Sequence, residues 1–521
     1  MGPKSAAKPP RTDKYLKLLH RFYEPLILLR VLGQTRGPHI SSPQDASPTQ
    51  AARRRLLRNL SYLCDYEKGG TTTSAIGLEE TDQCFIFWIA SNEARTRQKI
   101  VAFLRNMLRE IRRINQSEND QNDHSKTEFI HTCIGFARSR VKKEIKLLSR
   151  SMKECEQHLD KDKIEIDSRL ATWLSKFTLD NSRSVEDVCV QAYDGRKSPE
   201  MRLLENHIHT TSGDSCLDRR AHAFAKVRHC LGRLADHVRA PMKVIEDSAA
   251  LHHLFSEYKV RLVNPAASNQ RPQADSHTDL RSILNRMLPA RESEFAAYEQ
   301  SLVTLDRKFQ ITARVRETYE KFEPGIHAEV QVLEHFHAAR LRFVDNDNYI
   351  GCSKPACYCC HLYFQHHPSH PVVPESHQKV YLNWGVPLLP GGPNDGGYIA
   401  QRDLLNTMVK TIRENALNQI KSKDGPLKWH ADSLTGITDL TVATSFSTRD
   451  VRGSILERQS TASDTDAAIL DDSSSITSWS DIPPESSRSP REDSADSSRG
   501  VHDGVETEVD SDSDPEGGAT L

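Results

Sequence analysis

One histidine, one glutamate and two cysteines carry the clearest chemical potential in this 521-residue chain. His327 and Glu329 stand one residue apart, and Cys357 and Cys360 follow as a C-x-x-C pair. This spacing lets both sulfurs approach one ion, and the imidazole of His327 can supply a third ligand for zinc (Zn2+). Because three protein ligands leave one coordination position open for water, such a site would be catalytic rather than structural.

Glu329 is placed for proton transfer rather than for binding metal. Pro324-Gly325 forms a chain-turning pair, so the pattern predicts a helix that begins near His327 and carries Glu329 in its first turn. A carboxylate in that position could take a proton from a water molecule and pass it to a substrate. Acid–base catalysis of this kind contributes about 10²–10⁴-fold, and Glu329 is therefore the predicted catalytic residue.

The two cysteines are expected at the start of a second helix, because residues 361–365 favour helical structure. Free N–H groups and the positive dipole end of that helix would favour thiolates. Other ligand sets remain open. Cys359 is adjacent to Cys360 and Cys352 lies nearby, so a structural site with four sulfurs, or with three sulfurs and a histidine, is an alternative. The C-x-x-C pair could also be a redox pair or two buried thiols.

The segment from Gly325 to Pro390 resembles the cytidine-deaminase-like superfamily, and within it the OTT-type predicted nucleic-acid or nucleotide deaminases of fungi. Its elements follow the order of the zinc-deaminase signature H-x-E…P-C-x-x-C, although one residue here separates Pro355 from Cys357. The matching segments are His327–Val330, Ile350–Lys354 leading into the cysteines, and Val380–Trp384 followed by Pro387.

The resemblance implies an α/β fold of three layers, α/β/α, with a mixed sheet and with zinc held between two helix N-termini. It gives His327, Cys357 and Cys360 the role of ligands and Glu329 the role of proton shuttle. The implied reaction is the hydrolytic deamination of a cytosine or adenine base in a nucleic acid or nucleotide.

Tyr358 and Trp384 are candidate substrate-binding residues, because aromatic rings beside the site could stack on a base. An alternative to the enzyme is a non-catalytic interaction or nucleic-acid-binding protein whose deaminase-like fold is stabilised by zinc. The two hypotheses differ in their consequences. In the alternative, removal of zinc destabilises the fold, whereas loss of the Glu329 carboxylate has no effect.

Deaminase folds of this superfamily usually carry a β-hairpin before the first zinc helix, and the sequence departs from that pattern. Residues 293–322 have apolar side chains spaced three and four apart, which predicts helix. Either the hairpin is degenerate, or the alternating residues from Phe309 to Val315 supply a strand. The run from Cys84 to Ala90 is the most apolar of the chain and is expected in the core.

Composition divides the chain into three parts. Residues 1–290 are expected to be mainly helical and of unknown role, and residues 291–445 to form the deaminase-like zinc domain. Residues 446–521 are expected as a disordered tail rich in Ser, Asp and Glu, because so polar a segment buries too little surface to offset chain entropy. Residues 461–521 hold 16 acidic and 3 basic residues, so the formal charge of −1 conceals +12 on residues 1–460.

The excess positive charge of residues 1–460 suggests a nucleic-acid partner, since a cationic face attracts phosphate backbones. The alternative is a solvated face whose charges are neutralised by neighbouring acids. The basic residues gather in three clusters: Arg53–Arg55 with Arg58, the cations between Arg95 and Arg113, and those between Arg138 and Lys146.

Cysteine use favours an intracellular protein, cytoplasmic or nuclear. The eleven cysteines are scattered and odd in number, which suits a reducing compartment better than a disulfide framework. The segment Met1–Lys14 is polar and basic, so no signal peptide is expected. The stretch Tyr15–Leu32 contains several charged residues and a proline, which makes it too polar to span a bilayer. We therefore expect no membrane partner.

Overall fold

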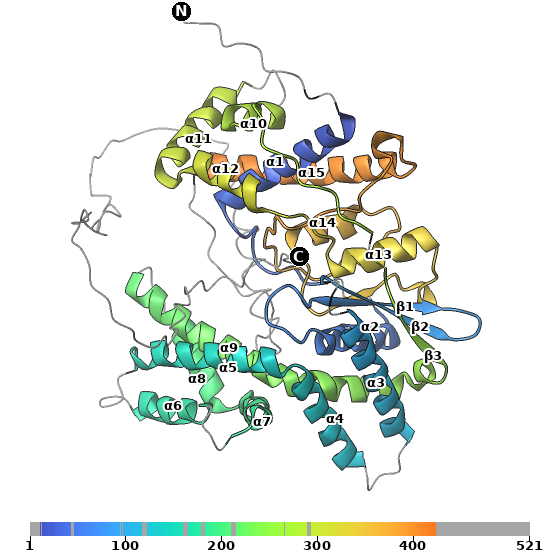
Figure 1. The fold of residues 1–521 in the computed structure, drawn as a ribbon. Coiled ribbons are helices and arrows are strands. Elements are labelled where there is room, and N and C mark those ends of the chain that lie inside the picture. Colours follow the sequence, from blue (N-terminus) through green and yellow to red (C-terminus); the bar gives the residue numbers. More distant parts are fainter. Residues whose placement is uncertain are drawn as a thin grey trace, which may run out of the picture. The chain divides into compact units, whose positions relative to one another are not determined.

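The structure is a computed structural model of the chain (Figure 1). The expected disordered tail, residues 446–521, lies outside the described residues. Within the described ranges, no helix combines the length and the apolar character that crossing a membrane requires. The structure describes residues 11, 13–42, 46–93, 95, 97–116, 122–159, 165–178, 183–209, 215–264, 266–288 and 293–423.

A four-stranded mixed sheet lies at the centre of the fold. Its strands are β1 (Ser74–Glu80), β2 (Phe85–Ser91), β3 (Tyr258–Leu262) and β4 (Ile350–Cys352), in the order β3-β2-β1-β4. β1 runs antiparallel to β2 and β4, whereas β2 and β3 are parallel. The predicted mixed sheet is confirmed, and β4 lies just before the cysteines.

The helices, most of them amphipathic, follow the apolar periodicity of the sequence. In chain order they are α1 (Lys14–Leu32), α2 (Pro48–Cys64), α3 (Arg97–Gln116), α4 (Asn122–Phe136), α5 (Arg138–Glu156), α6 (Glu165–Ser175), α7 (Val185–Gly195), α8 (Pro199–His209), α9 (Ser215–Ala250), α10 (Leu280–Met287), α11 (Phe295–Phe309), α12 (Ile311–Lys321), α13 (Ala328–Ala339), α14 (Tyr358–His366) and α15 (Tyr398–Ser422), with short 3-10 helices at His252–Phe255, Val344–Asn346 and Gly392–Asn394.

The β-hairpin of the fold is formed by β1 and β2 and does not directly precede His327. Residues 293–322 are largely helical as predicted, and the alternative of a strand between Phe309 and Val315 is wrong, because α11 ends and α12 begins there. Gln310 separates the two helices in a left-handed conformation (φ 52°, ψ 45°). The apolar residues of α12 that are buried recur every four positions, as on a helical face: Ile311, Val315 and Tyr319.

Helices cover both faces of the sheet and give the predicted three layers (Figure 1). α13 packs on one face with α14 beside it, and α2 and α3 pack on the other. Side chains of β1 alternate between these faces, as the pleat requires. Ala75 joins the core on the α13 side, whereas Ile76 and Leu78 join the core formed with α2 and α3. The α/β/α architecture is thereby confirmed.

Helix α1 belongs to the core on the α13 side rather than to the surface. Its residues from Leu26 to Leu29 are fully buried, and it packs against α15 and α12. Glu24 is also buried at 1% exposure, and it accepts hydrogen bonds of 2.7 Å from Arg11 and Arg286. Glu24, one of the charged residues that argue against a membrane span, is therefore paired inside the fold.

Gly351 allows β4 to lie directly against α2. A Cβ at this position would be 2.5 Å from the carbonyl carbon of Leu57, and backbone cannot move aside as a flexible side chain can. The hydroxyl of Ser61 on the same helix donates a 2.9 Å hydrogen bond to the Gly351 carbonyl. Close packing of this helix therefore holds the strand that leads into the loop before the cysteines.

Substitution of Gly351 by alanine should reduce the free energy of unfolding by about 1–3 kcal/mol, the usual range for overpacking a close contact. Urea denaturation of the purified protein measures this change as a lower midpoint. Gly396→Ala is the matched control, because a Cβ at Gly396 meets no atom within 4 Å. Equal midpoints for the two variants would show that the α2–β4 contact does not require glycine.

Helices α4 to α9 form a bundle with a core of its own, built from apolar side chains such as Leu170, Val188, Phe224 and Leu231. In the sequence this bundle stands between α3 and β3. Three of the four strands likewise come from residues 1–290, so this part of the chain contributes most of the sheet as well as the bundle. The proposed division at residue 290 stays a prediction.

The first basic cluster is largely neutralised by acids. Arg53 is 2% exposed and lies 2.5 Å from Asp345 and 3.4 Å from Asp347. Arg54 donates to both oxygens of Asp347 at 2.6 and 3.1 Å, and Arg55 pairs with Asp247. These arginines hold α2 against neighbouring elements, as the second interpretation of the charges requires.

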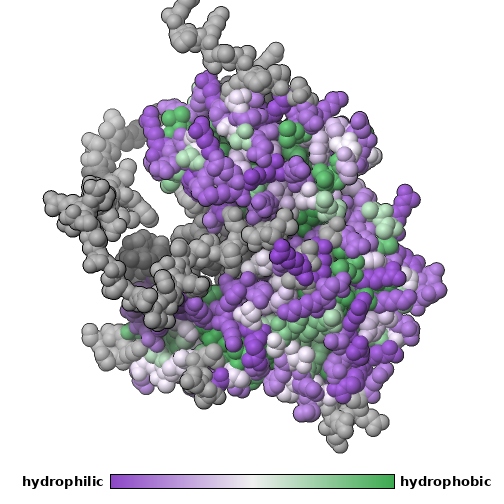
Figure 2. Space-filling model, in the orientation of Figure 1, coloured by the Kyte–Doolittle hydropathy of each residue, from purple (hydrophilic) through white to green (hydrophobic). Residues whose placement is uncertain are grey.

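Hydrophilic side chains dominate the visible surface, with smaller apolar patches among them (Figure 2). Large apolar side chains that are exposed within the described ranges are distributed over several elements, for example Leu16 of α1, Val303 of α11 and Ile399 of α15. Single exposed apolar residues of this kind are normal on a protein surface and need no partner to explain them.

Candidate metal centre and active site

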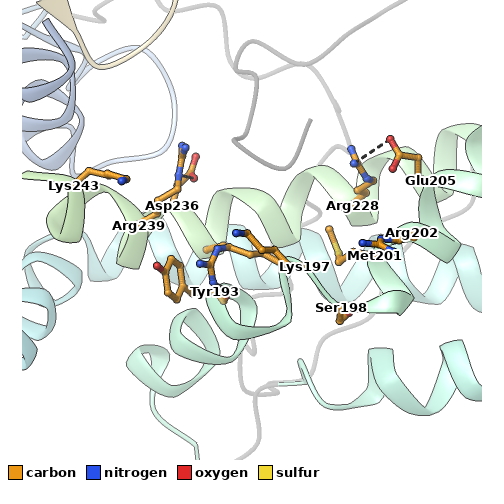
Figure 3. Close-up of a pocket in the computed structure, with 12 residues that line it drawn as sticks. Tyr193, Lys197, Ser198, Met201, Arg202, Glu205, Arg228, Asp236, Arg239 and Lys243 are labelled. Atoms are coloured by element: carbon orange, nitrogen blue, oxygen red, sulfur yellow. Dashed lines mark hydrogen bonds and ion pairs between the residues drawn. The ribbon is translucent and has the colours of Figure 1, made fainter. Parts of the chain in front are cut away.

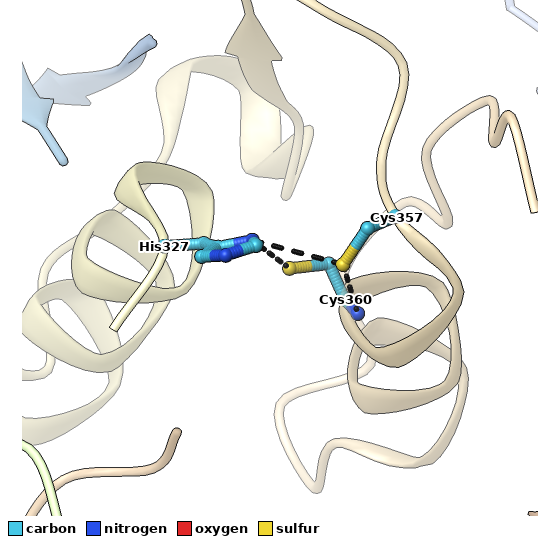
Figure 4. A group of neighbouring side chains, drawn as sticks. All are labelled: His327, Cys357 and Cys360. Atoms are coloured by element: carbon cyan, nitrogen blue, oxygen red, sulfur yellow. Dashed lines mark hydrogen bonds between the residues drawn. The ribbon is translucent and has the colours of Figure 1, made fainter. Parts of the chain in front are cut away.

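The metal ligands predicted from the sequence converge at the N-termini of two helices (Figure 4). His327 is the N-cap residue of α13 and Cys357 is the N-cap residue of α14, as expected. The Nδ1 atom of His327 lies 3.6 Å from the Sγ atom of Cys357 and 3.3 Å from that of Cys360. All three donor atoms lie within 4.8 Å of one another, and the three residues are buried.

Local hydrogen bonds hold both helix ends in place. The backbone N–H of Cys360 donates to the Cys357 sulfur at 3.4 Å, so the C-x-x-C pair caps its own helix. On the other side, the N–H of Ala328 donates to the side-chain oxygen of Asn92 at 2.8 Å. Asn92 follows β2 directly and fixes the helix that carries His327. Sequence reasoning missed Asn92, although its place two residues after the most apolar run was a signal.

Glu329 lies in the first turn of α13 and is 5% exposed. Its Oε2 atom accepts a hydrogen bond from the Cys352 thiol at 3.8 Å. The carboxylate is also close enough to Cys360 to raise the pKa of that thiol, after the larger effects of burial and of Cys357. Glu329 is therefore directed toward the sulfur ligands and not toward bulk solvent.

The other two nearby cysteines stay outside the group of converging donors. Cys359 is fully buried, and burial raises the pKa of its thiol. Cys352 is at the end of β4, and its pKa is raised by burial and by the charge of Glu329. In the part of the chain that the structure describes, His327, Cys357 and Cys360 form the one group of three possible ligands. The geometry therefore favours the three-ligand set over a four-sulfur site.

Burial disfavours the charged form of each side chain in this site. Interactions between His327 and Cys357 offset this effect of burial. Burial lowers the pKa of His327, yet the Cys357 thiolate outweighs it and raises the pKa to about 9. Burial raises the pKa of Cys357, yet the hydrogen bond from Cys360 and the charge of His327 lower it to about 6. At neutral pH these side chains form an imidazolium–thiolate pair beside a neutral Cys360 thiol.

The donor set fits a divalent metal ion. Two sulfurs and one imidazole nitrogen are ligands of the borderline-soft type, and their positions require little movement to share one ion. The second ring nitrogen of His327, Nε2, is buried and has no hydrogen-bond partner of good geometry among the described residues. The Asn383 backbone carbonyl nevertheless favours the protonated ring, so a polar group supports the imidazole from behind.

The loop after β4 is held by a buried acid that sequence reasoning also missed. Asp65 is fully buried, and it accepts a 3.2 Å hydrogen bond from Ser353 and pairs with Lys354 at 3.7 Å. Arg140 of the helical bundle lies 3.6 Å from the same carboxylate. Asp65 thus links the residues next to Cys352 to the bundle.

Trp384 contacts a candidate metal ligand directly. Its indole N–H donates to the Cys360 sulfur at 3.2 Å, and the side chain has no exposed surface. Its ring packs near those of Phe22 and Tyr363, at 5.4 and 5.6 Å between centroids. Tyr358 is 2% exposed, and its hydroxyl accepts a 2.7 Å hydrogen bond from Asn415. Substrate binding by the two aromatics stays a prediction, and neither ring has free surface to support it.

Replacing Trp384 by phenylalanine should weaken metal binding by about 10–100-fold, the usual effect of removing a group that supports a metal ligand. Competition with a chromogenic chelator measures the dissociation constant. Trp88→Phe is the matched control, because Trp88 also loses an indole hydrogen bond, at 2.6 Å to Glu79, but on the sheet. The same change in affinity for both variants would mean that the Cys360 contact is not responsible.

The three-layer fold and the convergence of these donors beside an acid are the features expected of a deaminase-like domain. The family model described as an OTT_1508-like deaminase matches residues 326–388, a segment that holds both helix starts, Glu329 and Trp384. This match confirms the resemblance seen in the sequence. Neither the curated proteins nor the solved structures gave a significant match to the chain.

Proposed function

We propose that this protein is a zinc-dependent hydrolytic deaminase that acts on a cytosine or adenine base in a nucleic acid or nucleotide. The observation that carries the proposal is the position of Glu329, in the first turn of the helix that His327 caps and directed at the paired cysteines. The match of residues 326–388 to a deaminase family supports the reaction class.

The metal would be held by His327, Cys357 and Cys360. Zinc fits this set because it accepts sulfur and imidazole ligands in a tetrahedral arrangement and can keep one position for water. When bound, zinc supplies a Lewis acid that makes water markedly more acidic near neutral pH. Trp384 supports the site by holding the Cys360 sulfur in place through its N–H group.

Glu329 moves the protons of the reaction. As a carboxylate it takes one proton from the attacking water while the water oxygen bonds to the amino-bearing ring carbon, C4 of cytosine or C6 of adenine. That proton goes to the adjacent ring nitrogen. The second water proton reaches the exocyclic amine through the same carboxylate. The C–N bond then breaks with its electron pair on nitrogen, so ammonia leaves and the base keeps the oxygen as a keto group.

Burial of the site supports this chemistry. His327 and Glu329 are 8% and 5% exposed, so little bulk water surrounds the carboxylate. In such surroundings charges interact more strongly than in water, and fixed groups can stabilise a developing charge without rearranging. The hydrogen bond between Asn92 and the start of α13 keeps the imidazole and the carboxylate on one rigid element.

Turnover by the zinc-loaded full chain tests the proposal. The protein is incubated with single-stranded DNA, single-stranded RNA, nucleotides and nucleosides that contain cytosine or adenine. Ammonia and the deaminated base, uracil or hypoxanthine, are expected in equal amounts for at least one substrate. Absence of both products for every substrate, at full zinc occupancy, would contradict the proposed activity.

A second candidate is a zinc-stabilised interaction protein that retains the fold without catalysis. The observation that favours it is the burial of the whole group, since Cys357 and Cys360 are at most 2% exposed and a base needs access. For this candidate, chelation of the metal lowers the melting temperature, whereas loss of the Glu329 carboxylate changes neither stability nor partner binding.

A further inference from the structure

Helices α7, α8 and α9 line a cavity of about 530 Å3 whose walls are strongly basic (Figure 3). This cavity belongs to the helical bundle and shares no lining residue with the metal centre. Six cationic side chains line it against two acidic ones. The cations are Arg196, Lys197, Arg202, Arg228, Arg239 and Lys243, and the acids are Glu205 and Asp236.

The two acids are already engaged by cations of the same wall. Glu205 lies 3.2 Å from Arg228, and Asp236 lies 2.7 Å from Arg239. Lys243 pairs with Glu246 at 2.6 Å, but more than two fifths of each of these side chains is exposed, so water screens that pair. The acids of the cavity therefore leave most of its positive charge uncompensated.

Three further cations supply the uncompensated charge. Lys197 and Arg202 are exposed at the edge of the cavity, and no acid in the described part of the chain forms an ion pair with either. The guanidinium of Arg196 lies over the ring of Tyr193, 3.4 Å from its centroid, and donates to the Tyr193 carbonyl. These contacts fix the cationic group of Arg196 but do not neutralise it, because neither partner carries a negative charge.

The cationic side chains extend along the bundle instead of surrounding one point. Arg228, Arg239 and Lys243 come from α9, and the distance along that helix from the first to the last is about 22 Å at 1.5 Å per residue. Lys197 and Arg202 face them from the connection to α8 and from α8 itself (Figure 3). A single phosphate would use only part of this length, whereas several consecutive phosphates of a strand would use all of it.

We propose that the basic cavity between α7, α8 and α9 binds the phosphate backbone of a nucleic-acid strand. The inference names the substrate class of the proposed deaminase as a polynucleotide, and to that extent it rests on the proposed function. Binding depends on charge and length and not on base identity, because the wall presents arginine and lysine groups. The strand is anchored on the bundle while chemistry takes place at the metal centre.

The test measures binding of a fluorescein-labelled oligo(dT) to the full chain by anisotropy, as a function of salt. The double variant Lys197→Glu and Arg202→Glu should weaken binding at least about tenfold at low salt. Its salt slope should fall by about 1.4, since each phosphate contact with a single strand contributes about 0.7. Both side chains are exposed, and circular dichroism verifies that the variant is folded.

A matched double variant, Lys308→Glu and Arg316→Glu, makes the same change in net charge at exposed positions of α11 and α12. It should keep the slope of the original protein. Equal weakening by both double variants would mean that overall charge and not the cavity attracts the strand, and would overturn the proposal. So would a failure of the original protein to bind oligo(dT) at low salt.

Competition separates a strand from a small anion. Inorganic triphosphate carries phosphate groups like those of the strand but is much shorter. It should therefore displace oligo(dT) only at concentrations far above those of the strand. If triphosphate displaces it at comparable concentrations, the cavity binds a free polyphosphate and the strand proposal is wrong. Glu329→Gln must retain binding. Absence of turnover by the original protein on every base, with oligo(dT) binding intact, would contradict the deaminase proposal and leave the cavity assignment standing.

Discussion

Glu329→Gln is expected to lower kcat by about 10²–10⁴-fold, the contribution typical of a positioned acid–base group. Glutamine has the same shape and length as glutamate but cannot accept and return a proton. Because Glu329 is not one of the three converging ligands, metal content should stay unchanged. Steady-state kinetics on the best substrate of the panel measures kcat, and metal analysis with thermal unfolding verifies that the site is intact.

Glu323→Gln provides the control for this experiment. Glu323 lies a few residues before the same helix. Its side chain is exposed, whereas that of Glu329 is buried. It should keep the full kcat. Equal product formation by Glu329→Gln and the original protein would remove Glu329 from the mechanism. If both variants lost activity, the cause would be a general effect of altered charge near α13.

The convergence of His327, Cys357 and Cys360 could be predicted in part from the sequence, because the information that places each residue at a helix start is local. A chain-turning Pro324-Gly325 pair precedes the helix that His327 caps, and C-x-x-C spacing by itself brings two sulfurs to one helix start. Each of these features depends on only a few consecutive residues. What sequence reasoning could not provide is the distance between the two helix starts, which depends on how both pack within the same core.

The sheet could not be predicted in the same way, because its strands are far apart in the sequence. β1 pairs with β4 through Ala75 and Cys352. β2 pairs in parallel with β3, although the whole helical bundle separates these two strands in the sequence. Strand pairing of this kind is decided by tertiary contacts and not by local propensity. The apolar run from Cys84 to Ala90 was correctly expected in the core, but nothing local showed that it forms the hairpin of the fold.

Charge clusters show a related limit. The sequence shows three consecutive arginines from Arg53, but the acid that pairs with Arg53 in the structure, Asp345, comes 292 residues later. In contrast, the cations of the α7–α9 cavity are spread between Arg196 and Lys243 and do not form a dense cluster in the sequence. For the first cluster, density of charge along the chain was thus a poor guide to where positive charge remains uncompensated in space.

Trp384 shows what a family motif conveys and what it leaves out. The resemblance places an aromatic residue near the centre, and the structure confirms that proximity. The motif does not say whether the ring face or the N–H group is used. The Trp384 N–H group donates to the Cys360 sulfur, and the ring is fully buried. A base that enters the site must therefore contact other residues.

Cys357→Ser is expected to abolish metal binding while preserving the start of α14. Serine is a favoured N-cap residue and can accept the hydrogen bond that the Cys360 N–H now gives to sulfur, but its hydroxyl is a poor ligand at neutral pH. Zinc content should fall from one ion per chain to nearly none. The original protein should gain about 4 kcal/mol of stability when free zinc is 1,000 times its dissociation constant, and the variant should gain none.

Thermal unfolding with and without zinc, together with metal analysis, measures both effects. Cys84→Ser is the control, because Cys84 is a half-buried thiol away from the metal centre, and it should bind zinc normally. If Cys357→Ser retained one zinc ion and its stabilisation, the ligand set would be different from the one assigned here, with Cys352 or Cys359 as the replacement to examine first.

Acid should weaken metal binding in two steps, because the ion must displace protons. Between pH 6 and 9 binding removes one proton from His327, whose pKa is raised to about 9, and one from Cys360, whose pKa is raised further. Affinity should then fall about 100-fold for each unit of decreasing pH. Below pH 6 Cys357, with its pKa lowered to about 6, also carries a proton, and the fall should steepen to about 1,000-fold per unit. A chelator titration repeated across this range measures the slope, and a constant affinity would contradict the imidazolium–thiolate pair as the state that receives the metal.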